Sequence, residues 1–144
     1  MNKAGKAFEE LVKIMDELRE KCPWDREQTF ESIRNLTIEE TYELTDALLE
    51  KDYQNVKKEL GDLLLHIVFY SKIASESNLF NITDVIDQLS KKLIYRHPHI
   101  FGTEQVASAS EVLENWEQIK MTEKGGNKTV LSGVPKSLSA LIKA

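Results

Sequence analysis

The sequence contains few of the residues that interrupt helices or cross-link chains. Its 144 residues include one cysteine, Cys22, together with three prolines and six glycines. A single cysteine excludes an intramolecular disulfide, and we expect the chain to work in the reducing cytoplasm. No apolar run approaches the roughly 20 residues that a membrane-spanning helix requires, so no membrane segment is expected.

Basic residues are also in the minority, with 19 lysines and arginines against 24 aspartates and glutamates and a net charge of −5. Proteins that bind extended nucleic acids usually carry a basic surface, so no extended nucleic-acid partner is expected. A small anionic ligand remains compatible with this charge, because local basic groups or a bound cation can override it. Hydrophobic residues make up 41% and charged residues 30% of the chain, which indicates a globular rather than a disordered protein.

Apolar residues recur at helical spacing through most of the chain, and no alternating pattern typical of strands is present. We expect helices at about residues 4–20, 29–50, 53–76, 81–95 and 108–124. The second is expected to split near Asn35, because Thr37 and Glu40 have the spacing of a capping box. The third has a middle that is apolar nearly all round, which predicts burial on more than one side. The fold class is therefore all-α, a helical bundle spanning residues 1–128 and followed by a tail at 129–144.

Two acidic clusters lie on the second and third of these helices. Glu40 and Glu43 share a helix face, as do Glu59 and Asp62, because each pair is three residues apart. In an antiparallel hairpin that turns at Lys51-Asp52, Glu40 is level with Asp62 and Glu43 with Glu59. Four carboxylates at similar heights repel one another unless a cation neutralises them. A set of oxygen ligands without cysteine suits Mg²⁺ or Mn²⁺.

Other interpretations of this hairpin remain open. Acidic pairs are common on solvated helix faces, and a ferritin-like di-iron site also uses carboxylates, with a Glu-x-x-His motif on two of its helices. His66 follows Asp62 by four residues, which is the wrong step for that motif, and we interpret it as a packing histidine. Gly61 lies inside the third helix, where glycine costs about 1 kcal/mol relative to alanine. A close helix contact or a bend would explain it.

Several segments together resemble the MazG family of nucleoside triphosphate pyrophosphohydrolases. The acidic motif alone marks a wider all-α pyrophosphohydrolase superfamily, whereas the Cys-Pro-Trp-Asp and Arg-His-Pro-His segments are much more specific. The matching segments cover residues 22–29, the acidic hairpin with 59–64, then 92–101 and 116–120. Residues 131–141 are similar to the connector that follows the first of two domains in longer members.

The resemblance implies bundled helices that assemble as a homodimer and hydrolyse nucleoside triphosphates to monophosphate and pyrophosphate with magnesium. Glu40, Glu43, Glu59 and Asp62 match the metal ligands of the family. Glu39 matches the first glutamate of the motif, where it would position water or act as an outer ligand. Glu39 and Glu40 are therefore the candidate catalytic residues, one carboxylate accepting a proton from the attacking water.

Hydrolysis of a triphosphate also requires basic groups that bind the outer phosphates. Lys92, Arg96 and Lys120 are the candidates. Trp116 and Trp24 could stack on a base, although core packing is the default interpretation for large aromatic residues. The alternative function, from a different class, is a non-catalytic dimerisation or regulatory domain that retains metal or nucleotide binding. A plain helical bundle that binds neither is a third.

Overall fold

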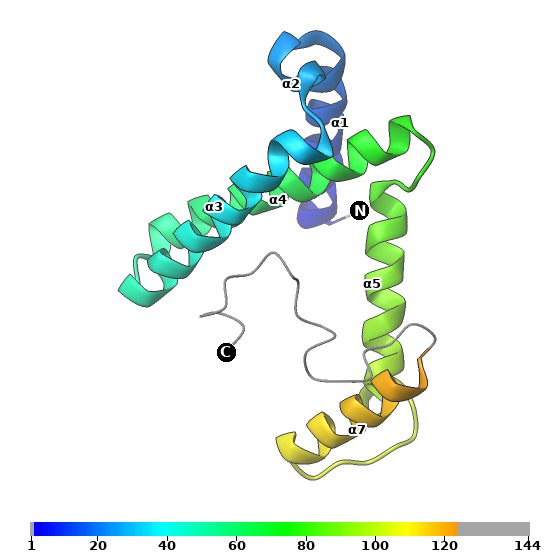
Figure 1. Cartoon of the computed structure of the whole chain (residues 1–144). Coiled ribbons are helices and arrows are strands. Elements are labelled where there is room, and N and C mark those ends of the chain that lie inside the picture. The colour runs from blue at the N-terminus through cyan, green and yellow to red at the C-terminus, as the bar shows by residue number, and fades with distance from the viewer. Residues whose placement is uncertain (1, 124–144) are drawn as a thin grey trace. The chain divides into compact units, whose positions relative to one another are not determined.

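The computed structural model describes residues 2–123, and every regular element in this range is an α-helix. The expected all-α fold is therefore confirmed (Figure 1). In chain order the helices are α1 (Lys3–Lys21), α2 (Pro23–Glu27), α3 (Phe30–Glu50), α4 (Tyr53–Glu76), α5 (Ile82–Arg96), α6 (Pro98–Phe101) and α7 (Ala109–Thr122). The chain divides into two units between Ile86 and Asp87, within α5. The predicted tail at 129–144 lies outside the described residues.

Helices α1 and α2 meet at Cys22, where Pro23 begins the second helix at a position that needs no backbone N–H donor. The sequence predicted a break here, and the structure adds a short helix after it. Arg19 holds this corner, because its Nη1 donates to the carbonyl oxygens of Asp25, Arg26 and Gln28 at 2.6, 3.0 and 2.9 Å. The corner is therefore fixed by a side chain of α1 rather than by an apolar contact alone.

Helices α3 and α4 form an antiparallel hairpin whose two members lie side by side (Figure 1). The turn is at Lys51 and Asp52, as predicted: Lys51 adopts a left-handed conformation, and the Asp52 side chain accepts a hydrogen bond from the Asn55 amide. The predicted split near Asn35 is wrong, because α3 continues through it. The capping box that starts α3 involves Thr29 and Ser32, and Thr37 instead donates its hydroxyl proton back to the carbonyl of Ile33.

The core of the first unit lies where α1 contacts α4 and the start of α3. Its buried side chains are Met15, Ile33, Val68, Phe69 and Ile73. Phe8, Leu11, Phe30, Tyr70 and Ile82 pack around them. The apolar periodicity of α1, α3 and α4 therefore converges at one end of the hairpin and leaves the end near the turn to polar and partly exposed side chains.

The prediction that α4 is buried on more than one side holds for its C-terminal half, where the buried residues are His66, Val68, Phe69, Ser71, Ile73 and Ala74. The apolar side chains of α4 near the acidic segment are substantially exposed, namely Leu60, Leu64, Leu65 and Ile67. A single copy of this unit has too few helices to cover both faces of the hairpin. None of the helices in residues 2–123 has the length and apolar character needed to cross a lipid bilayer.

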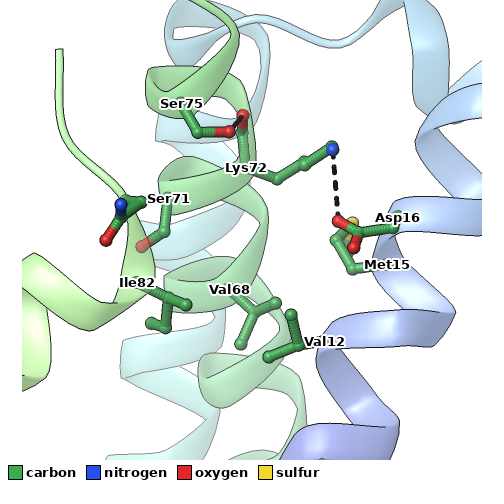
Figure 2. Close-up of a pocket in the computed structure, with 9 residues that line it drawn as sticks. Val12, Met15, Asp16, Val68, Ser71, Lys72, Ser75 and Ile82 are labelled. Carbon is green, nitrogen blue, oxygen red and sulfur yellow. Dashed lines mark hydrogen bonds and ion pairs between the residues drawn. The ribbon is translucent and has the colours of Figure 1, made fainter. Parts of the chain in front are cut away.

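A cavity of about 260 Å³ flanks the core of the first unit (Figure 2). Val12, Met15 and Val68 line its apolar side, and Ser71 and Ser75 line part of its polar side. The two hydroxyls donate to backbone carbonyls of their own helix. An ion pair of 3.1 Å between Lys72 Nζ and Asp16 Oδ1 links α4 to α1 beside the cavity.

The second unit consists of the rest of α5 with α6 and α7. Ser108 caps α7 by accepting a hydrogen bond from the Glu111 amide, which agrees with the predicted start of this helix. Arg96 at the end of α5 forms a two-point ion pair with Glu123, with N–O distances of 3.1 and 2.9 Å. This ion pair ties the end of α5 to the end of α7.

Candidate metal centre

The α3–α4 hairpin brings three of the predicted ligands together. One carboxylate oxygen each of Glu40, Glu43 and Glu59 lies within 4.8 Å of the other two. Asp62 is outside this group of three, and its Oδ2 is instead 3.2 Å from Lys58 Nζ. Glu39 is exposed and does not belong to the group either. The helix spacing that predicted the cluster therefore holds for both members of the α3 pair, Glu40 and Glu43, and for Glu59 of the α4 pair.

Burial makes this cluster different from a solvated acidic face. Glu59 is only 3% exposed, and both Glu59 Oε2 and Glu40 Oε2 are buried with no hydrogen-bond donor in the part of the chain that the structure describes. A buried ionised carboxylate oxygen without a partner carries a large desolvation penalty. Hard oxygen ligands in this arrangement fit a hard divalent cation such as Mg²⁺ or Mn²⁺. The residues present therefore suit the metal that the sequence predicted.

The two buried carboxylates titrate as a pair. A hydrogen bond to Glu59, burial, and the charges of Asp62 and Glu43 together raise the pKa of Glu40 to about 7. The proton shared with Glu40, and then the ammonium of Lys58, hold the pKa of Glu59 below its ordinary value. A proton between Glu40 and Glu59 thus neutralises part of the negative charge of the cluster.

Lys58 is a residue that the sequence analysis did not select. Its Nζ lies 3.1 Å from Glu59 Oε1 and 3.2 Å from Asp62 Oδ2, and its side chain is 65% exposed. Hydrogen bonds to Glu59 and then to Asp62 raise the pKa of this lysine. The sequence could have indicated this contact, because Lys58 precedes Asp62 by four residues and side chains at that spacing meet on a helix surface.

One helical turn further along the hairpin lies a second group that the sequence analysis did not predict. Thr37 Oγ1 is 2.8 Å from His66 Nδ1 and is also hydrogen-bonded to the hydroxyl of Tyr70. His66 is 8% exposed. It is therefore a buried histidine, as the sequence indicated, but one with a polar partner on the facing helix.

The predicted phosphate ligands, Lys92, Arg96 and Lys120, belong to the second unit, as does Trp116. Arg96 is engaged by Glu123, while Lys120 Nζ lies 5.8 Å from the ring centre of Trp116 and 3.9 Å from Glu117 Oε1. Lys92 is exposed. The rings of His97 and Trp116 meet edge to face at 5.1 Å, and the Trp116 Nε1 is buried without a hydrogen-bond partner. These side chains form a basic and aromatic cluster around the end of α5 and α7.

Trp24, the other tryptophan, does not pack in the core. It is 56% exposed on the short helix α2, so the default expectation of core packing is wrong for this residue. Trp116 is half-buried.

Comparison with known proteins agrees with these features. Residues 28–101 match the family described as MazG nucleotide pyrophosphohydrolase domain. The chain is 43% identical over 142 residues to a nucleoside triphosphate pyrophosphohydrolase of Escherichia coli K12, covering 95% of this chain and 54% of that protein. It is 50% identical over 131 residues to nucleoside triphosphate pyrophosphohydrolase/pyrophosphatase MazG of Thermotoga maritima, covering 90% of this chain and 50% of that protein. The chain thus spans about half the length of these curated relatives.

A solved structure has the same fold. The crystal structure of a mazG-related protein from Thermotoga maritima superposes with a TM-score of 0.68 at 25% identity, covering 78% of this chain and 97% of that one. The family match itself extends over just more than half of the chain and includes all four predicted metal ligands. The chain therefore belongs to the MazG nucleotide pyrophosphohydrolase domain family.

Proposed function

We propose that this chain hydrolyses nucleoside triphosphates to nucleoside monophosphate and pyrophosphate, with a divalent cation, Mg²⁺ or Mn²⁺, bound by Glu40, Glu43, Glu59 and Asp62. Family membership and the names of the curated relatives support a triphosphate as the substrate. The chain spans about half the length of those relatives, so hydrolysis by this chain alone is proposed here and does not follow from their names.

The observation that carries the proposal is the pair of buried carboxylate oxygens on Glu40 and Glu59 that lack a donor. A protein that used these glutamates only for solubility would expose them, and one that used them for stability would pair them. Glu43 lies with them in the same cluster, and Asp62 is close enough to affect the pKa of Glu40. The group is thus suited to bind a cation. It is also suited to a substrate that arrives with a cation already bound.

The chain's own residues can take defined parts in the reaction. A bound Mg²⁺ would supply positive charge for the phosphoryl oxygens. One carboxylate at the site, with Glu39 and Glu40 as the candidates, would accept a proton from the attacking water. Glu39 is exposed beside Glu40 in the sequence, where it could orient a water molecule. The family resemblance implies the water-positioning role of Glu39 and the metal-binding role of Glu40.

Binding of the outer phosphates is proposed for Lys92, Arg96 and Lys120, with Trp116 as a stacking surface for the base. Among the described residues Lys92 forms no ion pair, and Lys120 forms only a long one, 3.9 Å from Glu117. Arg96 would have to exchange Glu123 for phosphate. Arg96 is therefore the least accessible of the three to a ligand.

Assembly as a homodimer is part of the proposal. The exposed apolar side chains of α4 support it, because contiguous apolar surface on a soluble protein usually has a partner. The single cysteine suits the reducing cytoplasm as the site of action.

The test is pyrophosphate release from a panel of ribo- and deoxyribonucleoside triphosphates in the presence of Mg²⁺. Pyrophosphate and orthophosphate are measured separately, because only pyrophosphate reports cleavage between the α and β phosphates. The double variant Glu40→Gln/Glu43→Gln should abolish release. Asp46→Asn/Glu50→Gln is the matched control, since it removes the same charge from exposed positions of α3 outside the cluster.

Equal activity of the two double variants would contradict the proposed site. Mg²⁺ binding without any pyrophosphate release, from the folded wild-type chain, would instead favour the non-catalytic regulatory domain.

A further inference from the structure

The polar group formed by Thr37, His66 and Tyr70 lies inside the hairpin, one turn from the acidic cluster. Thr37 precedes Glu40 by three residues on α3, and His66 follows Asp62 by four on α4, so both lie on the faces that carry the carboxylates. Burying a histidine and two hydroxyls is unfavourable unless their hydrogen bonds are satisfied. The hydrogen bonds of these three side chains therefore show which of their donor and acceptor atoms have a partner and which do not.

Proton counting limits the tautomer of His66. A threonine hydroxyl has one proton to donate and two positions at which it can accept. Thr37 Oγ1 contacts the carbonyl oxygen of Ile33 at 3.2 Å, and this oxygen can only accept. We take the Thr37 proton to lie on this bond, so that His66 Nδ1 and the Tyr70 hydroxyl donate to Thr37. In this arrangement the proton of the neutral ring is on Nδ1, and the lone pair of Nε2 is free.

The surroundings keep this ring neutral and direct it toward the acidic site. Burial lowers the pKa of His66, and the charge of Asp62 opposes this effect only in part, which also indicates that Asp62 is near. Helical side chains lean toward the N-terminus of their helix, so the ring of His66 lies over the turn that carries Asp62. Nothing in residues 2–123 donates a hydrogen bond to Nε2. Ionised carboxylates cannot do so, since they only accept.

We propose that His66 is a positioning residue whose Nε2 accepts a hydrogen bond from a water molecule held at the acidic site. The inference rests on the cation site of the proposed function, because Mg²⁺ retains several of its waters when it binds protein carboxylates and those waters are hydrogen-bond donors. Thr37 and Tyr70 fix the tautomer and the ring orientation, in the same way that partners beyond the ligands of a metal site orient the groups around it.

The first test is ¹⁵N NMR of the imidazole nitrogens in the full chain, with the signals of His66 identified by their loss in His66→Asn. Without Mg²⁺, Nδ1 should have the shift of a protonated nitrogen and Nε2 that of a bare one. Mg²⁺ should move the Nε2 signal and leave Nδ1 protonated. The same titration of Glu40→Gln/Glu43→Gln should move neither.

The second test uses two substitutions that mimic one ring nitrogen each. The amide of His66→Asn reaches about as far as Nδ1, so it keeps the bond to Thr37 and removes the acceptor at Nε2. The amide oxygen of His66→Gln reaches the position of Nε2. Calorimetry with Mg²⁺ should give about tenfold weaker binding for His66→Asn than for His66→Gln, at similar thermal stability without Mg²⁺.

The outcomes separate the two proposals. Absence of Mg²⁺ binding by the wild-type chain would overturn the cation site and the role of His66 with it. Mg²⁺ binding with an unmoved Nε2 signal, with a proton found on Nε2, or with equal affinities of the two His66 variants would overturn the role of His66 alone.

Discussion

Glu40 and Glu59 face each other across the α3–α4 hairpin, and one buried oxygen of each has no donor unless a proton or a cation lies between them. This relationship predicts a pH effect. The ordinary pKa of Glu40, near 4.5, is raised to about 7 in the folded chain. Between these values the folded state binds more protons than the unfolded state, so its stability falls as the pH rises through this window.

We expect Mg²⁺ to remove this loss. Thermal unfolding without Mg²⁺ should give a midpoint that decreases from pH 5 to pH 7.5, relative to Glu40→Gln at each pH, and saturating Mg²⁺ should restore it. Binding of Mg²⁺ should also tighten with rising pH and release a proton, which calorimetry in two buffers of different ionisation enthalpy measures. A proton release of zero at pH 6.5 would contradict the shared proton.

Among residues 2–123, Lys58 is the cation that forms ion pairs at the cluster, with Glu59 and Asp62. Lys58→Gln should therefore lower the unfolding temperature of the Mg²⁺-free chain, and Mg²⁺ should reduce the difference because it replaces the missing charge. Lys57→Gln is the matched control, since Lys57 is exposed next to it and makes no ion pair among the described residues. Equal effects of the two substitutions would mean that only net charge matters and not the contact.

The sequence predicted the acidic cluster because the determinants are local. Helical spacing puts Glu40 and Glu43 on one face, and the turn at Lys51-Asp52 sets which residues of α4 lie opposite. Both signals are contained in a short stretch of chain. Placing Glu59 beside Glu40 and Glu43 required nothing more than these two facts.

The errors came from contacts between distant residues. Thr37 has the spacing of a helix cap, yet it lies within α3, because its hydroxyl is bonded to Ile33, His66 and Tyr70. The partner of Arg19 on α4 is 57 residues away, so no local pattern could indicate the ion pair. The exposure of Leu60 and Leu64 on α4 could not be predicted for a similar reason, since periodicity shows which face is apolar and not what covers it.

Arg19 should be among the most sensitive positions for stability. Its guanidinium donates to three backbone carbonyls of the α2 corner and to both oxygens of Glu76, at 2.9 Å each. Lysine cannot reproduce this planar set of donors. Arg19→Lys should lower the free energy of unfolding by about 2–3 kcal/mol, since hydrogen bonds to charged groups contribute about 1.5–3 kcal/mol each. Chemical denaturation measures the change.

Two further measurements test this assignment. Lys13→Met breaks an exposed ion pair with Glu9 on the same helix and should have little effect. The hydrogen bond from Arg19 holds the pKa of Glu76 below its ordinary value, so its contribution is present above that value and is lost as the pH falls through the lowered pKa. The stability difference between wild type and Glu76→Gln should therefore shrink in acid. A constant difference down to pH 3 would contradict the ion pair.

Met15 anchors α1 in the core and is almost completely buried. Met15→Ala should lower the free energy of unfolding by about 2–5 kcal/mol, because it removes apolar contacts and leaves a cavity. Ile14→Ala is the matched control on the next residue, which is about half exposed, and should have a much smaller effect. If the two substitutions were equally harmful in urea denaturation, α1 would be packed by a different face.

Gly61 tests whether something outside this chain covers α4 at the acidic site. The sequence suggested a close helix contact or a bend at this glycine, but apart from its chain neighbours and the backbone of its own helix no described atom lies within 4 Å of where a Cβ would be. Within one chain, Gly61→Ala should therefore be tolerated and should stabilise α4 by about 1 kcal/mol through helix propensity. Thermal unfolding and the mass measured by light scattering would be followed together, with Mg²⁺ affinity as a third readout.

The sign of the change distinguishes two reasons for the glycine. A higher unfolding temperature with unchanged mass and Mg²⁺ affinity is the result expected from the open space around Gly61. A lower unfolding temperature together with a lower mass would show that a second copy approaches α4 at this point, next to Asp62 and the exposed Leu60 and Leu64. In that case the acidic site would lie at an interface between copies. The change in stability of Gly61→Ala would then come from weakened assembly and not from helix propensity.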